Sequence, residues 1–112
     1  MAIQSVLIGQ IDTILLQVPN GVRYAVTVIM ICNTATPDPN DETANATTFD
    51  LHFVKQGTAL DNVNKVISSL PMSAGETFTF DTEKIILDAG DRIILNSDSP
   101  TVLSATVSFL EL

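Results

Sequence analysis

The chain has 112 residues, with 13 acidic and 5 basic side chains and a formal net charge of −8. A length of this order is that of one domain, so we expect a single domain over residues 1–112. A strongly acidic surface repels phosphate backbones and anionic lipid headgroups, so we expect no nucleic-acid binding and no membrane binding. The single cysteine cannot form an internal disulfide, and residues 1–10 lack the basic start and cleavage site of a secretory signal.

The first half of the chain consists of short runs rich in Val, Ile, Thr and Phe, whose period of two predicts antiparallel strands rather than helices. The expected strands are residues 3–8, 13–18, 23–33 and 48–56. The third is the longest, and its alternation places Tyr24, Val26, Val28, Met30 and Cys32 on one face. Apolar residues occupy both of its faces, which predicts a central strand covered on both sides. A long polar loop, residues 34–47, follows it and is expected to be exposed.

The second half predicts strands at residues 63–70, 76–80, 85–87, 92–96 and 101–112, the first of these with the weakest pattern. Three turns share a glycine signature, in which Gly21, Gly75 and Gly90 supply the positive φ that a tight reversal needs. About eight to nine short strands with frequent turns predict an all-β, antiparallel, jelly-roll-like β-sandwich. Its expected core is Val26, Val28, Ile31, Phe49, Leu51, Phe53, Phe78, Phe80, Ile93, Leu95, Val107 and Phe109.

Catalytic chemistry has little support in the residue types. His52 is the only histidine, whereas metalloenzymes of this architecture bind their metal through at least two histidines and a carboxylate. A nucleophile–histidine–acid triad would pair His52 with Cys32 or a serine, but no nucleophile elbow lies near it. We therefore expect no enzyme and no cofactor, with His52 an ordinary strand residue and Cys32 a small buried hydrophobe.

The loop 34–47 holds the best candidates for a ligand site. Its oxygen-bearing side chains Asp38, Asn40, Asp41 and Glu42 are weak candidates for Ca²⁺, because they lack the fixed spacing and central glycine of an EF-hand. A solvated acidic loop is the simpler interpretation, and a Ca²⁺- or glycan-binding adhesion module that uses this loop is the alternative.

Two further polar patterns are expected to carry no function. A second acidic stretch is expected to be a charged rim, and it comprises Asp81, Glu83, Asp88 and Asp91. The glycosylation triplet at residues 45–47 is expected to be a chance match, since no secretory signal accompanies it.

The order of the turn and strand motifs is similar to that of a known family. Residues 18–34 read VPNGVRYAVTVIMICNT, in which a V-P-x-G turn leads into a long strand ending in C-N. Residues 70–80 carry L-x-x-x-x-G-E-T-F-x-F, residues 87–94 carry L-x-A-G-D-x-I, and residues 102–112 end in Glu-Leu. In this order and spacing, the chain resembles small virion structural proteins of tailed bacteriophages, apart from the loop 35–46.

The resemblance implies a β-sandwich building block of a phage particle, in a capsid-decoration, neck or tail-associated position. Its implied partners are copies of itself, as a homo-oligomer, and other virion proteins. It implies localisation in the virion after synthesis in the host cytoplasm, and it carries over no catalytic residue.

Overall fold

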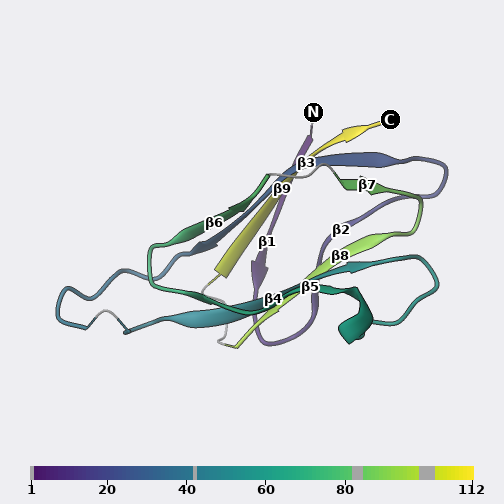
Figure 1. Cartoon of the computed structure of the whole chain (residues 1–112). Helices are drawn as coiled ribbons and strands as arrows, with labels where there is room; N and C mark the ends of the chain where they lie inside the picture. Colours follow the sequence, from purple (N-terminus) through teal and green to yellow (C-terminus); the bar gives the residue numbers. More distant parts are fainter. Residues whose placement is uncertain (1, 42, 82–84, 99–102) are drawn as a thin grey trace.

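The computed structural model of the chain describes residues 2–41, 43–81, 85–98 and 103–112. These residues form nine strands and one 3₁₀ helix, and every strand pair is antiparallel (Figure 1). The elements are β1 (Ala2–Ile8), β2 (Thr13–Gln17), β3 (Tyr24–Asn33), β4 (Thr47–Val54), η1 (Asn62–Asn64), β5 (Lys65–Met72), β6 (Thr77–Phe80), β7 (Ile85–Leu87), β8 (Arg92–Ser97) and β9 (Leu103–Glu111). The all-β prediction is confirmed, and the weakly predicted strand after residue 62 forms as β5.

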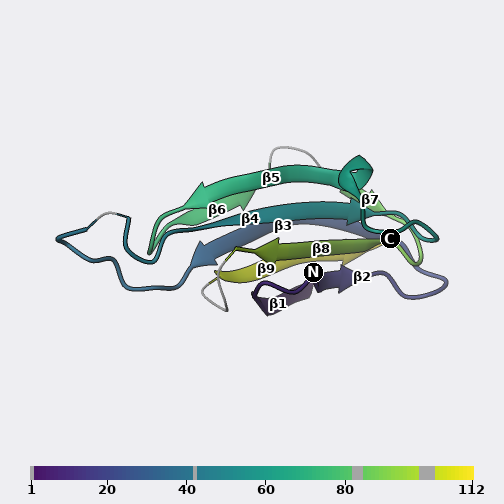
Figure 2. The same cartoon turned by 90° about the horizontal axis from the view of Figure 1, so that it is seen from below.

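The strands build two sheets that lie face to face, one above the other in Figure 1 and overlapping in the view of Figure 2. The five-stranded sheet has the order β1-β9-β3-β6, with β7 also paired to β3, and the four-stranded sheet has the order β2-β8-β4-β5. The pairs β1·β9, β2·β8, β3·β6/β7 and β4·β5 are nested in sequence, as in one long hairpin rolled up. Because β6 and β7 pair with successive parts of β3, they share one strand position, and the topology is that of a jelly roll.

A β-bulge in β3 changes which side chains face the core. Val26 pairs with Phe109 and Val28 pairs with the next residue of β9, Ser108, so Thr27 is an extra residue in β3. The Thr27 hydroxyl donates to the Ser108 carbonyl at 3.0 Å. An inserted residue reverses the alternation that follows it. Val26 therefore points inward while Val28 points outward, and the prediction of one continuous face from Tyr24 to Cys32 is wrong.

The core lies between the sheets and is mainly aliphatic. Of the expected core, eight side chains are buried: Val26, Ile31, Phe49, Leu51, Ile93, Leu95, Val107 and Phe109. Four expected members are only half-buried: Val28, Phe53, Phe78 and Phe80. Val28 is turned outward by the bulge. The three phenylalanines pack against the cluster near its margin, where Phe53 and Phe80 meet edge to face across the two sheets with ring centroids 6.0 Å apart.

The expectation that the long strand 23–33 is covered on both sides is also wrong. Met30, at the centre of β3 on its outward face, is 40% exposed. Cys32 on the same face is half-buried rather than buried. The outer surface of the five-stranded sheet is therefore bare of any other described element at this point.

Candidate functional site

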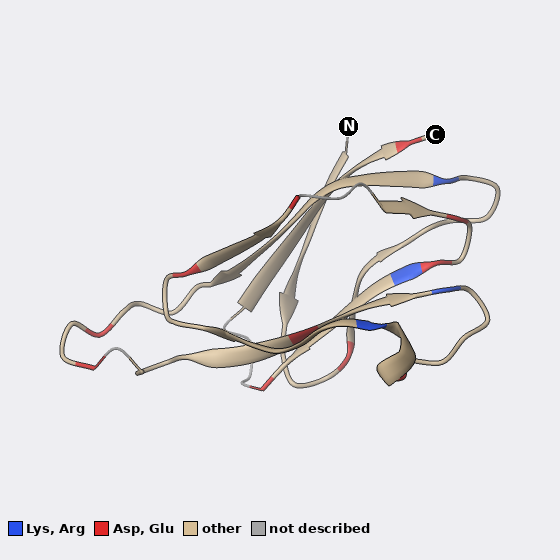
Figure 3. Cartoon of the chain, in the orientation of Figure 1, with Lys and Arg blue, Asp and Glu red and all other residues tan. Residues whose placement is uncertain are grey.

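The outward face of the five-stranded sheet is the most distinctive surface of the fold. Strand register places its side chains in cross-strand rows: Ile3, Ser108 and Val28; Ser5, Thr106, Met30 and Thr79; Leu7, Ser104, Cys32 and Thr77; and, beyond the bulge, Leu110, Ala25 and Ile86. We call this set the uncharged face, because every member is a serine, a threonine or an apolar residue. In Figure 3 the acidic and basic residues of this sheet lie at strand ends and in turns.

The outward face of the four-stranded sheet is different in kind. Asp50 on β4 forms an ion pair with Lys65 on β5 at 3.6 Å, and the Asn96 amide of β8 donates to Asp12 at 2.7 Å. The segment between β4 and β5, which includes η1, lies against β4 here (Figure 2). Beside it, His52 and Ile94 are only 3% and 6% exposed. One face of the sandwich is thus charged and partly covered, whereas the other is uncharged and is not covered by any other described element.

His52 lies on the outer side of β4, as a strand residue should. Its Nδ1 is buried and makes no hydrogen bond to any residue that the structure describes, and a shallow polar hollow beside it is lined by Asp50, Asp61, Lys65 and Asn96 among others. Cys32, the partner that a thiol-based triad would need, is on the opposite sheet. Within the described ranges, no group of three or more His, Cys, Asp or Glu side chains is placed to hold a metal ion.

The acidic loop forms an arm that projects beyond the end of the sandwich (Figure 1). Its carboxylates are engaged by the loop itself: Asp38 Oδ1 accepts from the Asn40 amide at 2.9 Å, and Asp41 Oδ1 accepts from the amide and hydroxyl of Thr43 at 3.0 and 2.8 Å. These bonds to Thr43 lower the pKa of Asp41. The fourth candidate ligand, Glu42, lies outside the described residues.

The base of this arm is held by Asn33, which is fully buried at the end of β3. Its side-chain amide donates to the carbonyls of Asn45 and Met72 at 2.9 and 3.3 Å, and its Oδ1 accepts from the Ala35 amide at 3.1 Å. Its backbone bonds to Glu76 and Gly75 in the β5–β6 turn at 2.9 Å. The C-N strand end seen in the sequence is therefore a hub that fixes both ends of the arm.

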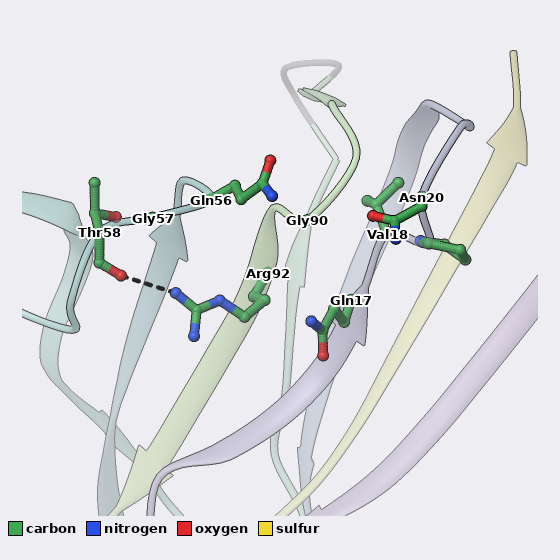
Figure 4. A pocket seen from close by; sticks show the side chains of 9 residues that line it. Gln17, Val18, Asn20, Gln56, Gly57, Thr58, Gly90 and Arg92 are labelled. Atoms are coloured by element: carbon green, nitrogen blue, oxygen red, sulfur yellow. Dashed lines mark hydrogen bonds between the residues drawn. The ribbon is translucent and has the colours of Figure 1, made fainter.

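A hollow of about 570 Å³ opens at the other end of the sandwich (Figure 4). It is lined by residues of three turns, and within it the Arg92 guanidinium donates to the Thr58 carbonyl at 2.9 Å. Beside it, the Asp91 carboxylate accepts from the backbone amides of Gln56 and Asp88 at 3.0 and 2.9 Å. Asp91, expected in a charged rim, thus braces two turns together. Asp81 and Asp88 lie at the ends of β6 and β7, and Glu83 is outside the described residues.

The uncharged face was not predicted from the sequence, although the sequence contains a pattern that indicates it. The alternation of Ser104, Thr106 and Ser108 with buried neighbours shows that one side of the last strand is polar and uncharged. Residues 2–11 and 24–37 also contain no Asp, Glu, Lys or Arg. What the sequence lacked was the pairing that brings these three uncharged segments together.

Comparison with known proteins gives no family for the chain: no protein-family model, no curated protein and no solved structure matches it. The resemblance to phage virion proteins therefore stays a prediction that rests on the motifs alone. Across the described residues, no helix combines the length and the apolar character that crossing a bilayer would require.

Proposed function

We propose that the chain is a non-enzymatic structural subunit of a tailed-bacteriophage particle, which acts by assembling with copies of itself and with other particle proteins. Its place in the particle is a capsid-decoration, neck or tail position, reached after synthesis in the host cytoplasm. Two independent lines support this proposal: the order of the turn and strand motifs, and the uncharged face of the five-stranded sheet.

The uncharged face carries the proposal because of what burial does to charge. Moving a charged side chain from water into an interface is unfavourable unless it is paired, so the centres of protein interfaces are depleted in charged residues. A free surface in a chain with 18 charged residues among 112 has no such constraint. The hydroxyl groups on this face, such as those of Ser5 and Thr106, which are hydrogen-bonded at 2.9 Å, keep the face of the isolated subunit hydrated without adding a charge.

A matched pair of substitutions tests the role of this face. Met30 at its centre is 40% exposed, and Ile14 on the outward side of β2, in the other sheet, is 45% exposed. We expect Met30→Glu to fold but to be lost from purified particles, whereas Ile14→Glu is incorporated like the wild type. The readout is mass spectrometry of particles from a phage that carries each variant, with the position located by electron microscopy.

Two outcomes count against the proposal. If the wild-type chain is absent from purified particles, the virion role fails altogether. If Met30→Glu is incorporated as well as Ile14→Glu, the uncharged face is not the docking surface.

A further inference from the structure

The sheet edges of this fold are protected unequally. Exposed edge strands invite pairing with other chains, and proteins usually block them with charge, proline, bulges or short length. Edge strand β2 has a register shift between Ile14 and Leu16, and β5 carries Lys65, Pro71 and two register shifts against β4. The edge formed by β6 and β7 consists of strands of only four and three residues.

The edge strand β1 has none of these devices. Its sequence, AIQSVLI, contains no charge, proline or glycine, and all seven residues pair with β9 in an unbroken register. Ile3 and Leu7 on its outward side are 72% and 60% exposed. Strand β1 is therefore the single long, regular and uncharged edge among the described strands.

We propose that β1 pairs in antiparallel fashion with β1 of a second copy, about a two-fold axis that passes beside Ser5. Ser5 is the middle residue of the strand, so this register pairs the whole of Ala2–Ile8 with its equivalent. It sets Ile3 opposite Leu7 of the partner subunit and Leu7 opposite the partner's Ile3. The two exposed large apolar side chains of the strand thus cover each other on the same side of the sheet.

The charge distribution leaves this edge open to a second copy. Two molecules that each carry a net charge of −8 repel one another, and the repulsion is least where the contact surfaces carry no acids. Neither residues 2–11 nor the part of β9 that pairs with β1 contains a charged side chain. A two-fold contact also requires a self-complementary surface, which a register centred on Ser5 provides.

The pairing would join two five-stranded sheets into one and set their uncharged faces side by side. This inference deepens the proposed function and rests on it for its setting, because a two-fold dimer offers a particle a doubled docking face. Dimerisation is measured on the purified chain, whereas the virion role is measured on particles, so the two fail independently.

The test uses sedimentation of the full chain over a range of concentrations. We expect a reversible dimer for the wild type, and at least about a tenfold rise in its dissociation constant for Ile3→Lys with Leu7→Lys, which opposes like charges across the interface. Combining Ile3→Lys with Leu7→Glu sets opposite charges against each other only in the proposed register, and should restore the dimer. Val66→Lys, on exposed edge strand β5, is the control that leaves the dimer unchanged.

A second measurement covers the case in which the lysine variants do not fold. In a Cys32→Ser background, Ser5→Cys should give a disulfide-linked dimer on mild oxidation, since residues facing each other across antiparallel strands lie within disulfide range. Thr13→Cys in the same background should stay monomeric. A wild-type chain that stays monomeric at all concentrations overturns the proposal. So does a dimer that is not linked by Ser5→Cys and is not changed by the charged substitutions at Ile3 and Leu7. A monomer that binds only a strand from another protein also overturns it.

Discussion

The side-chain amide of Asn33 donates to the backbone carbonyl of Asn45 at 2.9 Å, across the base of the projecting arm. Asn45 has a φ of 61°, a left-handed conformation that non-glycine residues seldom adopt. Because Asn33 also bonds to Met72 and Ala35, one fully buried amide joins the end of β3 to both ends of the arm and to β5.

Replacing Asn33 should therefore be among the more damaging polar substitutions in the fold. We expect Asn33→Ala to lower the free energy of unfolding by about 2 kcal/mol, because it leaves carbonyl groups without a partner at a buried position. This corresponds to a fall in Tm of roughly 8 °C for a domain of this size. Asn40→Ala, in the exposed part of the same arm, is the control and should change Tm little. Equal effects of the two substitutions would mean that the hub is not important for stability.

Gly90 lies in a turn where both backbone conformation and space demand glycine. Its φ is +86°, and an added Cβ would lie 2.6 Å from side-chain atoms of Gln56. Gly21 has a similar φ of +82°, but no atom of the described residues lies within 4 Å of such a Cβ. We expect Gly21→Ala to reduce stability by about 1 kcal/mol from backbone strain alone, and Gly90→Ala by about 3 kcal/mol from strain and overpacking.

Urea unfolding of the two variants measures this difference. In a Gln56→Ala background the substitution at Gly90 should lose part of its effect, because the nearest side-chain atoms are gone. If the two glycine variants were equally stable, the contact with Gln56 would not contribute.

The carboxylate of Asp41 should titrate below the usual range, because Thr43 donates to it from both its amide and its hydroxyl. The folded-state pKa is lowered, so the stabilising contribution is fully present above the pKa of the unfolded chain. It is lost as the pH falls through the folded-state value. Thr43→Val removes the hydroxyl bond and should raise the pKa of Asp41 toward an ordinary aspartate.

Carboxyl NMR titration of the wild type and of Thr43→Val measures the shift directly. Thr58→Val is the control, because the Thr58 hydroxyl donates to the Lys55 carbonyl and not to a carboxylate. An unchanged Asp41 titration in Thr43→Val would contradict the assignment of the shift to that hydroxyl.

Calcium binding by the arm is the alternative function, and calorimetry decides it. We expect no heat on titration with Ca²⁺ at millimolar concentrations, because Asp38 and Asp41 each use an oxygen on the loop's own donors. Heat that disappears in Asp41→Ala would instead establish a cation site in the loop. The adhesion-module function would then be preferred over the structural role.

The strand pattern was predictable because it depends on local alternation and on turn glycines. Gly21, Gly75 and Gly90 all have the positive φ that their turns predict. The face of each strand was less predictable, since one extra residue reverses it. Nothing in the run from Ala25 to Ile29 marks Thr27 as the bulge, because its bond to Ser108 depends on a strand 81 residues away.

The candidate surfaces were hidden for the same reason. Alternation shows that β9 has a polar uncharged side, but only the order β1-β9-β3-β6 places that side next to Ile3 and Met30. Asn33 could be recognised as a strand end, whereas its bonds to Asn45 and Met72 depend on the packing of two later segments. Long-range pairing, more than local propensity, creates what is distinctive in this molecule.

Cys32 offers a probe that separates the two contacts proposed for the five-stranded sheet. It is the only cysteine, is half-buried and lies on the uncharged face, in β3. Strand β9 lies between β3 and β1, so pairing of β1 edges leaves the thiol open, whereas docking on the face covers it. We expect a thiol reagent to label the purified chain at the same rate in its monomer and dimer, and at least about tenfold more slowly in assembled particles, because a thiol must be solvent-accessible to react.

Labelling of particles followed by mass spectrometry gives the modified fraction, and denatured particles give the full-reaction control. In any Met30→Glu chain that is incorporated, Cys32 should be labelled as fast as in the free chain, because the uncharged face no longer docks on another particle protein. Protection of Cys32 in the isolated dimer would place the dimer contact on the uncharged face instead of on β1. Full labelling in intact particles would leave that face open to solvent and would direct the search for the docking surface to the four-stranded sheet.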